Sequence, residues 1–243
     1  MRGLAVSLSQ KTKGAKAMFK SFVIRNKKDL TDAVEEYGFL PFFSNSVEGF
    51  SVEENIAPEC WYHSGSGEWQ AWDWKGEIIR ETGCAYGKFF EKKACYVSPR
   101  WFPLLADYRR DGYDFDARYD DGLADRRDKV LYELIEGSEP VISKRLKQLG
   151  NYKKGGNKGF ETCITRLQSQ CYVLISDFVY MRDRFGKPYG WGVAEYSTPE
   201  RFMQGFSDRV YEETPEEAYE SLLRHFKMLF PNEDEKKLKR FIG

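Results

Sequence analysis

Histidine is scarce in this chain, which holds only His63 and His225 among its 243 residues. The sequence also lacks a Gly-x-Ser-x-Gly element and a phosphate-cradling glycine loop, which argues against triad hydrolases and nucleotide enzymes. No apolar run approaches the roughly 18 residues that a membrane helix needs, and no signal-peptide core is visible. We therefore expect neither a membrane protein nor a secreted one.

The 5 cysteines do not indicate a disulfide framework, because they are odd in number and irregularly spaced. Reduced thiols in a cytoplasmic protein explain this better than disulfides do. Cys60 and His63 have a metal-ligand spacing, but Cys84 and Cys95 lie too far apart to complete an ordinary zinc site. We predict buried thiols and no cofactor.

An acidic segment at 111–121 offers a second place for a metal. Carboxylates two residues apart can share a divalent cation or supply a general base, and the candidates among the aspartates of this segment are Asp114, Asp116, Asp120 and Asp121. Three arginines beside them favour a salt-bridged connector instead. We predict no metal site, and keep a metal-dependent enzyme as a third, weaker hypothesis.

The formal net charge is +0, but the charges are unevenly distributed. The first 28 residues carry cations and no acid: Arg2, Lys11, Lys13, Lys16, Lys20, Arg25, Lys27 and Lys28. We interpret residues 1–17 as a basic disordered tail, either an arm that searches nucleic acid or a loose extension ahead of a start at Met18.

Aromatic residues make up 16% of the chain, which excludes a disordered protein. Four tryptophans gather early, and they either stack an extruded base or build a core: Trp61, Trp69, Trp72 and Trp74. In this N-terminal region, 18–118, patterns predict a helix over 28–37, a capping box from Ser51 to Glu54, a hairpin of 86–90 with 94–98, and a helix over 99–110.

The region 119–198 has the most regular pattern. It predicts a helix over 123–135 capped by Asp120 or Asp121, an extended pair at 141–142, a helix from Ser143 to Leu149, and a third helix from Phe160 to Cys171. Two strands follow at 172–180 and 189–196, joined by a polar turn. Helices followed by a hairpin indicate a winged helix-turn-helix, whose third helix usually enters the major groove.

Hydrogen-bonding and cationic side chains gather on this module. We expect these to contact nucleic acid: Lys144, Lys147, Lys158, Thr162, Thr165, Arg166, Ser169, Arg182, Arg184 and Lys187. Residues 199–243 show helical periodicity, and we expect those helices to pack on the module. The predicted fold class is α+β, mainly helical, with the winged-helix module and an N-terminal α+β region that includes a small hairpin.

Several segments resemble the AlkZ/YcaQ-type DNA glycosylases, and more closely the shorter AlkZ-related proteins. They are Trp72-Asp73-Trp74, residues 85–90, 109–116 and 159–162, Leu167-Gln168 and residues 189–194. The resemblance spans most of the chain from about Phe22 onward. It implies winged-helix architecture, duplex DNA as partner and excision of alkylated, often N7-modified, purines.

The resemblance also implies a Gln-x-Gln motif that places the attacking water, and Gln168 and Gln170 match it as candidate catalytic residues. Residues two apart on a helix point away from each other, however, so packing at the helix border or phosphate contact is the alternative role. The hypothesis is a DNA-binding protein that excises or recognises alkylated bases in duplex DNA. A winged-helix scaffold for protein contact or transcriptional regulation, without catalysis, is the competing one.

Overall fold

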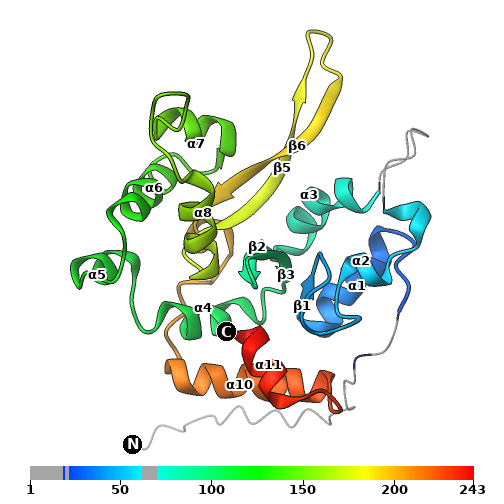
Figure 1. Ribbon diagram of the computed structural model, residues 1–243. Helices are drawn as coiled ribbons and strands as arrows, with labels where there is room; N and C mark the ends of the chain where they lie inside the picture. The colour runs from blue at the N-terminus through cyan, green and yellow to red at the C-terminus, as the bar shows by residue number, and fades with distance from the viewer. Residues whose placement is uncertain (1–18, 20–21, 62–69) are drawn as a thin grey trace, which may run out of the picture.

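The computed structural model describes Phe19, residues 22–61 and residues 70–243. The predicted tail at 1–17, His63 and Trp69 lie outside the described residues. The fold is α+β, as predicted, and its helices surround one six-stranded antiparallel sheet with the strand order β1-β3-β2-β5-β6-β4. Strands from the N-terminal region form one half of the sheet and strands from the following region form the other half (Figure 1).

The N-terminal half confirms the predicted helix, capping box and hairpin. Its elements are α1 (Lys27–Tyr37), β1 (Phe39–Pro41), α2 (Val52–Asn55), the 3-10 helix η1 (Pro58–Cys60), α3 (Ala71–Thr82), β2 (Ala85–Phe90), β3 (Lys93–Val97) and α4 (Phe102–Arg110). The Ser51 hydroxyl accepts from the Glu54 amide at 3.2 Å, which caps α2. Sequence patterns missed α3, because its buried residues lie on more than one face and blur the helical period.

The β2–β3 hairpin turns through only Glu91 and Lys92, since Phe90 pairs with Lys93. Both turn residues have positive φ, 48° and 58°, a conformation that favours glycine or asparagine. We expect Lys92→Gly to raise the free energy of unfolding by about 0.5–1 kcal/mol, because it relieves this backbone cost. Urea denaturation would measure the change, and a destabilised variant would contradict the assigned turn.

The second half follows the predicted order of helices and strands. Its elements are α5 (Phe115–Asp120), α6 (Arg126–Glu136), β4 (Val141–Ile142), α7 (Ser143–Leu149), α8 (Phe160–Ser169), β5 (Leu174–Arg182) and β6 (Pro188–Ser197). Three details differ from the prediction, and the first is that the helix predicted to reach Cys171 ends at Ser169. The helix predicted from Leu123 begins at Arg126, because Asp125 rather than Asp120 or Asp121 caps it. The acidic connector contains α5, whose N-terminus Asp114 caps.

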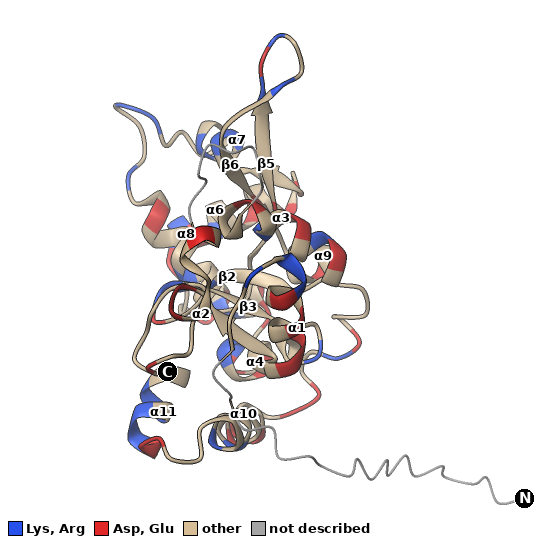
Figure 2. Ribbon diagram, turned by 90° about the vertical axis from the view of Figure 1, so that its right-hand side faces the viewer, with Lys and Arg blue, Asp and Glu red and all other residues tan. Residues whose placement is uncertain are grey.

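The C-terminal helices pack only partly as predicted. They are α9 (Pro199–Phe202), α10 (Pro215–Leu229) and α11 (Glu235–Ile242). We expected them to pack on residues 119–198, but α10 lies on α4, and both α10 and α11 lie at the end of the molecule opposite the β5–β6 hairpin (Figures 1 and 2). Phe226 explains the difference, because its ring contacts Phe39 and Phe90 of the N-terminal half, at centroid distances of 5.1 and 6.2 Å.

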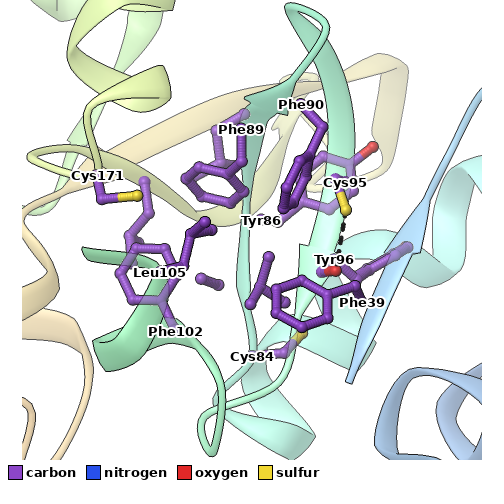
Figure 3. Close-up of a cluster of buried hydrophobic side chains, with 14 of the residues drawn as sticks. Phe39, Cys84, Tyr86, Phe89, Phe90, Cys95, Tyr96, Phe102, Leu105 and Cys171 are labelled. Atoms are coloured by element: carbon purple, nitrogen blue, oxygen red, sulfur yellow. Dashed lines mark hydrogen bonds between the residues drawn. The ribbon is translucent and has the colours of Figure 1, made fainter. Parts of the chain in front are cut away.

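One hydrophobic core runs through both halves of the sheet. Figure 3 shows its centre, where Phe89 and Phe90 of β2 lie among Phe39, Phe102 and Cys171. Cys171 follows α8, so the second half contributes directly to the core beneath the N-terminal hairpin. The two halves therefore form one packed unit rather than separate hydrophobic cores.

Candidate nucleic-acid interface

The β5–β6 hairpin projects from the body of the molecule, and the loop between α7 and α8 lies at the same end (Figures 1 and 2). Figure 2 shows cations on that loop and at the hairpin tip. The tip is an ordered turn, because the Asp183 carboxylate accepts from the amides of Phe185 at 2.8 Å and Lys187 at 2.9 Å. The cations on these two segments are therefore exposed to solvent.

The polar face of α8 is divided between solvent and β2. Thr162 is exposed near the N-terminus of the helix, whereas Thr165 and Ser169 lie half-buried against Lys88 of β2. The Lys88 ammonium donates to the Thr165 hydroxyl at 3.2 Å, and the Ser169 hydroxyl donates to the Lys88 carbonyl at 2.9 Å. The first turn of α8 is therefore the part that remains accessible to a large partner.

Arg166 is held within the fold by a carboxylate of α6. Its guanidinium donates to both carboxylate oxygens of Asp128, with the Nη2–Oδ1 distance at 2.7 Å. Asp128 is 1% exposed, while the Arg166 side chain keeps 37% of its surface exposed. A bidentate arginine–carboxylate pair neutralises both groups and orients α6 against α8. Arg166 thus has a structural task before any contact with phosphate.

Gln168 is buried, and both ends of its carboxamide form hydrogen bonds. It is 1% exposed, its carboxamide oxygen accepts from the Lys88 amide at 3.0 Å, and its nitrogen donates to the Ile164 carbonyl at 3.1 Å. A Cβ on Gly87 would lie 3.0 Å from that oxygen, so glycine permits this close approach of β2 to α8. Gln170 is half-buried at the C-cap of α8. The structure therefore does not bring the two glutamines together at one surface.

These placements predict that two alanine substitutions affect stability to different extents. Gln168→Ala should lower the free energy of unfolding by about 1–3 kcal/mol, because it leaves the buried Lys88 amide without an acceptor. Gln170→Ala, the matched control, should change it by less than about 0.5 kcal/mol. Urea denaturation of both variants measures the difference, and equal stabilities would contradict the role assigned to Gln168.

The predicted cations differ in how they are paired. Lys147 forms an ion pair with Glu161 at 2.9 Å, and Arg182 donates to the Gly186 carbonyl at 2.8 Å within the turn. Among the cations predicted to contact nucleic acid, four are exposed and have neither an ion pair nor a side-chain hydrogen bond to a described residue: Lys144, Lys158, Arg184 and Lys187. These four can give up water to bind an anion without breaking an internal bond.

The sequence reasoning missed three aromatic side chains on the same hairpin. Phe185, Tyr189 and Trp191 are 79%, 55% and 68% exposed, although large aromatics normally bury most of their surface. Gly190 has a positive φ of 72°, and the β5–β6 register shifts nearby, so a bulge redirects Trp191. The signal was the alternation Tyr189-Gly190-Trp191-Gly192 after a cationic turn.

The residues that were considered as metal ligands or as base-stacking aromatics take part in the folded structure itself. Asp116 pairs with Lys129 at 2.9 Å, and within residues 22–61 and 70–243 no three His, Cys, Asp or Glu side chains gather as metal ligands. Trp61 and Trp72 pack partly buried against the core, and Trp74 is 7% exposed. In the same described part, none of the helices has the length and apolar character to cross a membrane.

Comparison with known proteins places the chain in a family. No protein of curated function matches the sequence. Among solved structures, the fold is similar to Streptomyces sahachiroi DNA glycosylase AlkZ, with a TM-score of 0.46 and 11% identity. The similarity covers 93% of this chain but only 60% of that one, so this chain spans less than two thirds of its length. The model of the family described as AlkZ related matches residues 24–243, and the protein therefore belongs to the AlkZ-related family.

Proposed function

We propose that the protein binds duplex DNA through a winged helix-turn-helix formed by residues 126–197. In this assignment α6, α7 and α8 are the three helices, β4 pairs with β6 to complete the small sheet, and the β5–β6 hairpin is the wing. The exposed first turn of α8 would face the groove, and the wing would follow the backbone, as such modules usually do.

The observation that carries this proposal is the set of four unpaired cations, which we call the free cations: Lys144, Lys158, Arg184 and Lys187. They lie on α7, the loop before α8 and the hairpin turn, which share one end of the molecule (Figures 1 and 2). A surface spread over three segments suits a phosphate backbone better than a small anion. Of the other predicted contacts, Thr162 lies in the exposed first turn of α8 and Arg182 lies beside the hairpin turn.

The aromatic wing gives the interface a second mode of contact. Phe185 stands at the tip beside Arg184, whose guanidinium lies 4.6 Å from the ring centroid. Exposed aromatic rings stack on bases, and apolar wedges insert between base steps. We propose that Phe185 enters the base stack where it is weakened, which would favour damaged or distorted duplexes over intact ones.

Alkylated bases are the lesions that we propose, on the resemblance to AlkZ-type glycosylases. The catalytic role of Gln168 and Gln170 stays a prediction, and burial of Gln168 favours a structural role for it. None of the large exposed apolar side chains of residues 119–197 lies on α8, since they are Leu123, Val130, Leu149 and the three hairpin aromatics. The third helix therefore carries no apolar patch of the kind that a protein partner would need.

A single assay separates recognition from excision. Duplexes with and without N7-methylguanine are titrated with the protein, and base release is measured beside Gln168→Ala and Gln170→Ala. We expect binding to both duplexes, tighter for the alkylated one. Release by the unmodified protein that is lost in a folded glutamine variant would identify a glycosylase. Binding without release would identify a protein that recognises lesions, and absence of binding would refute the proposal.

A further inference from the structure

Lys75, on the N-terminal half of α3, occupies an unusual site for a lysine. The residue is 7% exposed, and its ammonium nitrogen lies 4.3 Å from the Trp72 ring centroid and 4.4 Å from that of Phe178. A third ring, Phe42, lies at 5.3 Å. No described residue forms an ion pair or hydrogen bond with it, although buried lysines are almost always paired.

The nearest carboxylate on α3 is engaged elsewhere. Asp73 accepts from the Gln70 amide at 3.2 Å and from the Tyr180 hydroxyl, and so caps α3 and anchors it to β5. Burial lowers the pKa of Lys75 to about 8, and the charge of Asp73 only partly opposes this. Near neutral pH the neutral form of this amine is therefore far more populated than that of an ordinary exposed lysine. Neutral amines are nucleophiles.

The amine also lies next to the proposed DNA surface. The Trp72 ring, which contacts the lysine, lies 6.2 Å from the ring of Trp191 on the wing, and Trp191 is 68% exposed. The Lys75 nitrogen is not completely enclosed by the described residues, so part of its surface is accessible. The Trp72 ring therefore contacts both the amine and the exposed ring on which a nucleotide would stack.

We infer that Lys75 is an amine nucleophile that forms an imine with the aldehyde of an abasic deoxyribose in DNA. The inference rests on the proposed function, since the wing must bring the DNA to the lysine. In the reaction the Nζ electron pair forms a bond to C1′ of the open-chain sugar, and a proton moves from nitrogen to the former carbonyl oxygen. The second nitrogen proton then leaves with that hydroxyl as water, and the nitrogen electron pair that it frees completes the C=N bond. No oxidant, reductant or metal is consumed.

The test traps the imine on the full chain. A duplex with one abasic site is incubated with the protein and sodium borohydride, which reduces an imine to a stable secondary amine. We expect a covalent protein–DNA adduct that peptide mass mapping places on Lys75. Lys75→Met, whose apolar side chain suits the aromatic surroundings, and Lys75→Arg should each lower the yield at least about tenfold. Lys236→Met, an exposed control, should leave it unchanged.

Parallel binding titrations distinguish this inference from the proposed function. Bound duplex without an adduct, or an adduct spread over surface lysines, would overturn the role of Lys75 while DNA binding stands. Absence of duplex binding would overturn both. In that case 2-deoxyribose 5-phosphate with borohydride tests the amine alone, and selective labelling of Lys75 would contradict DNA as the source of the aldehyde.

Discussion

Arg110→Met should lower the free energy of unfolding by about 2–4 kcal/mol, a large loss for a single substitution, because it leaves a buried carbonyl without a donor. Arg110 ends α4 and is 2% exposed. Its guanidinium donates to the Cys171 carbonyl at 2.9 Å, to Glu200 at 2.6 Å and to the Tyr211 hydroxyl at 3.0 Å. One cation therefore connects α4 with the end of α8, with α9 and with the segment before α10.

Methionine preserves the apolar stem of Arg110 but leaves these acceptors without a donor. The Cys171 carbonyl accepts from both Nε and Nη2, so the substitution removes two hydrogen bonds from one buried oxygen. Arg126→Met is the control, because Arg126 is exposed on α6, and it should change stability by less than about 0.5 kcal/mol. Urea denaturation compares the two, and equal losses would refute the connecting role of Arg110.

Removing the free cations together should weaken duplex binding on the order of 100-fold at moderate salt. The variant replaces Lys144, Lys158, Arg184 and Lys187 with alanine. None of the four forms an ion pair within the described chain, so their removal costs the fold little and acts on binding alone. Each DNA phosphate that the variant no longer neutralises should also reduce the slope of log K against log salt by about 0.9.

A matched variant controls for net charge. Lys92, Arg201, Lys236 and Arg240 are also exposed, and their side chains form no ion pair with described residues. They lie on other elements: the β2–β3 turn, α9 and α11. Replacing them removes the same formal charge from elsewhere. If both variants lose affinity equally, binding depends on overall charge, and the assigned surface is wrong.

The order of elements was predictable because the pattern changes from helical spacing to a strand-forming run at the end of α8. Its buried residues Phe160, Cys163, Ile164 and Leu167 have helical spacing, and the β-branched and aromatic run of β5 follows at once. The helical period could not show which segment packs against α8. Tyr86 of β2 pairs with Ile175 of β5, and this contact between distant segments places Lys88 over α8.

The same long-range contact explains which candidate residues were placed incorrectly by sequence reasoning alone. Helical geometry assigned Thr165 and Ser169 to a solvent face, but β2 covers them through Lys88. Lys75 could not be found from the sequence, because its burial depends on aromatic rings from three segments, and α3 itself had no clear period. The cations of the α7–α8 loop and the hairpin turn were predictable, because polar turn residues are exposed wherever the fold places them.

The salt dependence of duplex binding by the unmodified protein tests the central claim most directly. Binding would be followed by fluorescence anisotropy from about 50 to 200 mM salt, the range over which counterion release is resolved. We predict that log K falls with log salt, and that the slope flattens by about 3–4 when the free cations are removed. Unmeasurable binding at low salt, or a slope that the four substitutions leave unchanged, would contradict it.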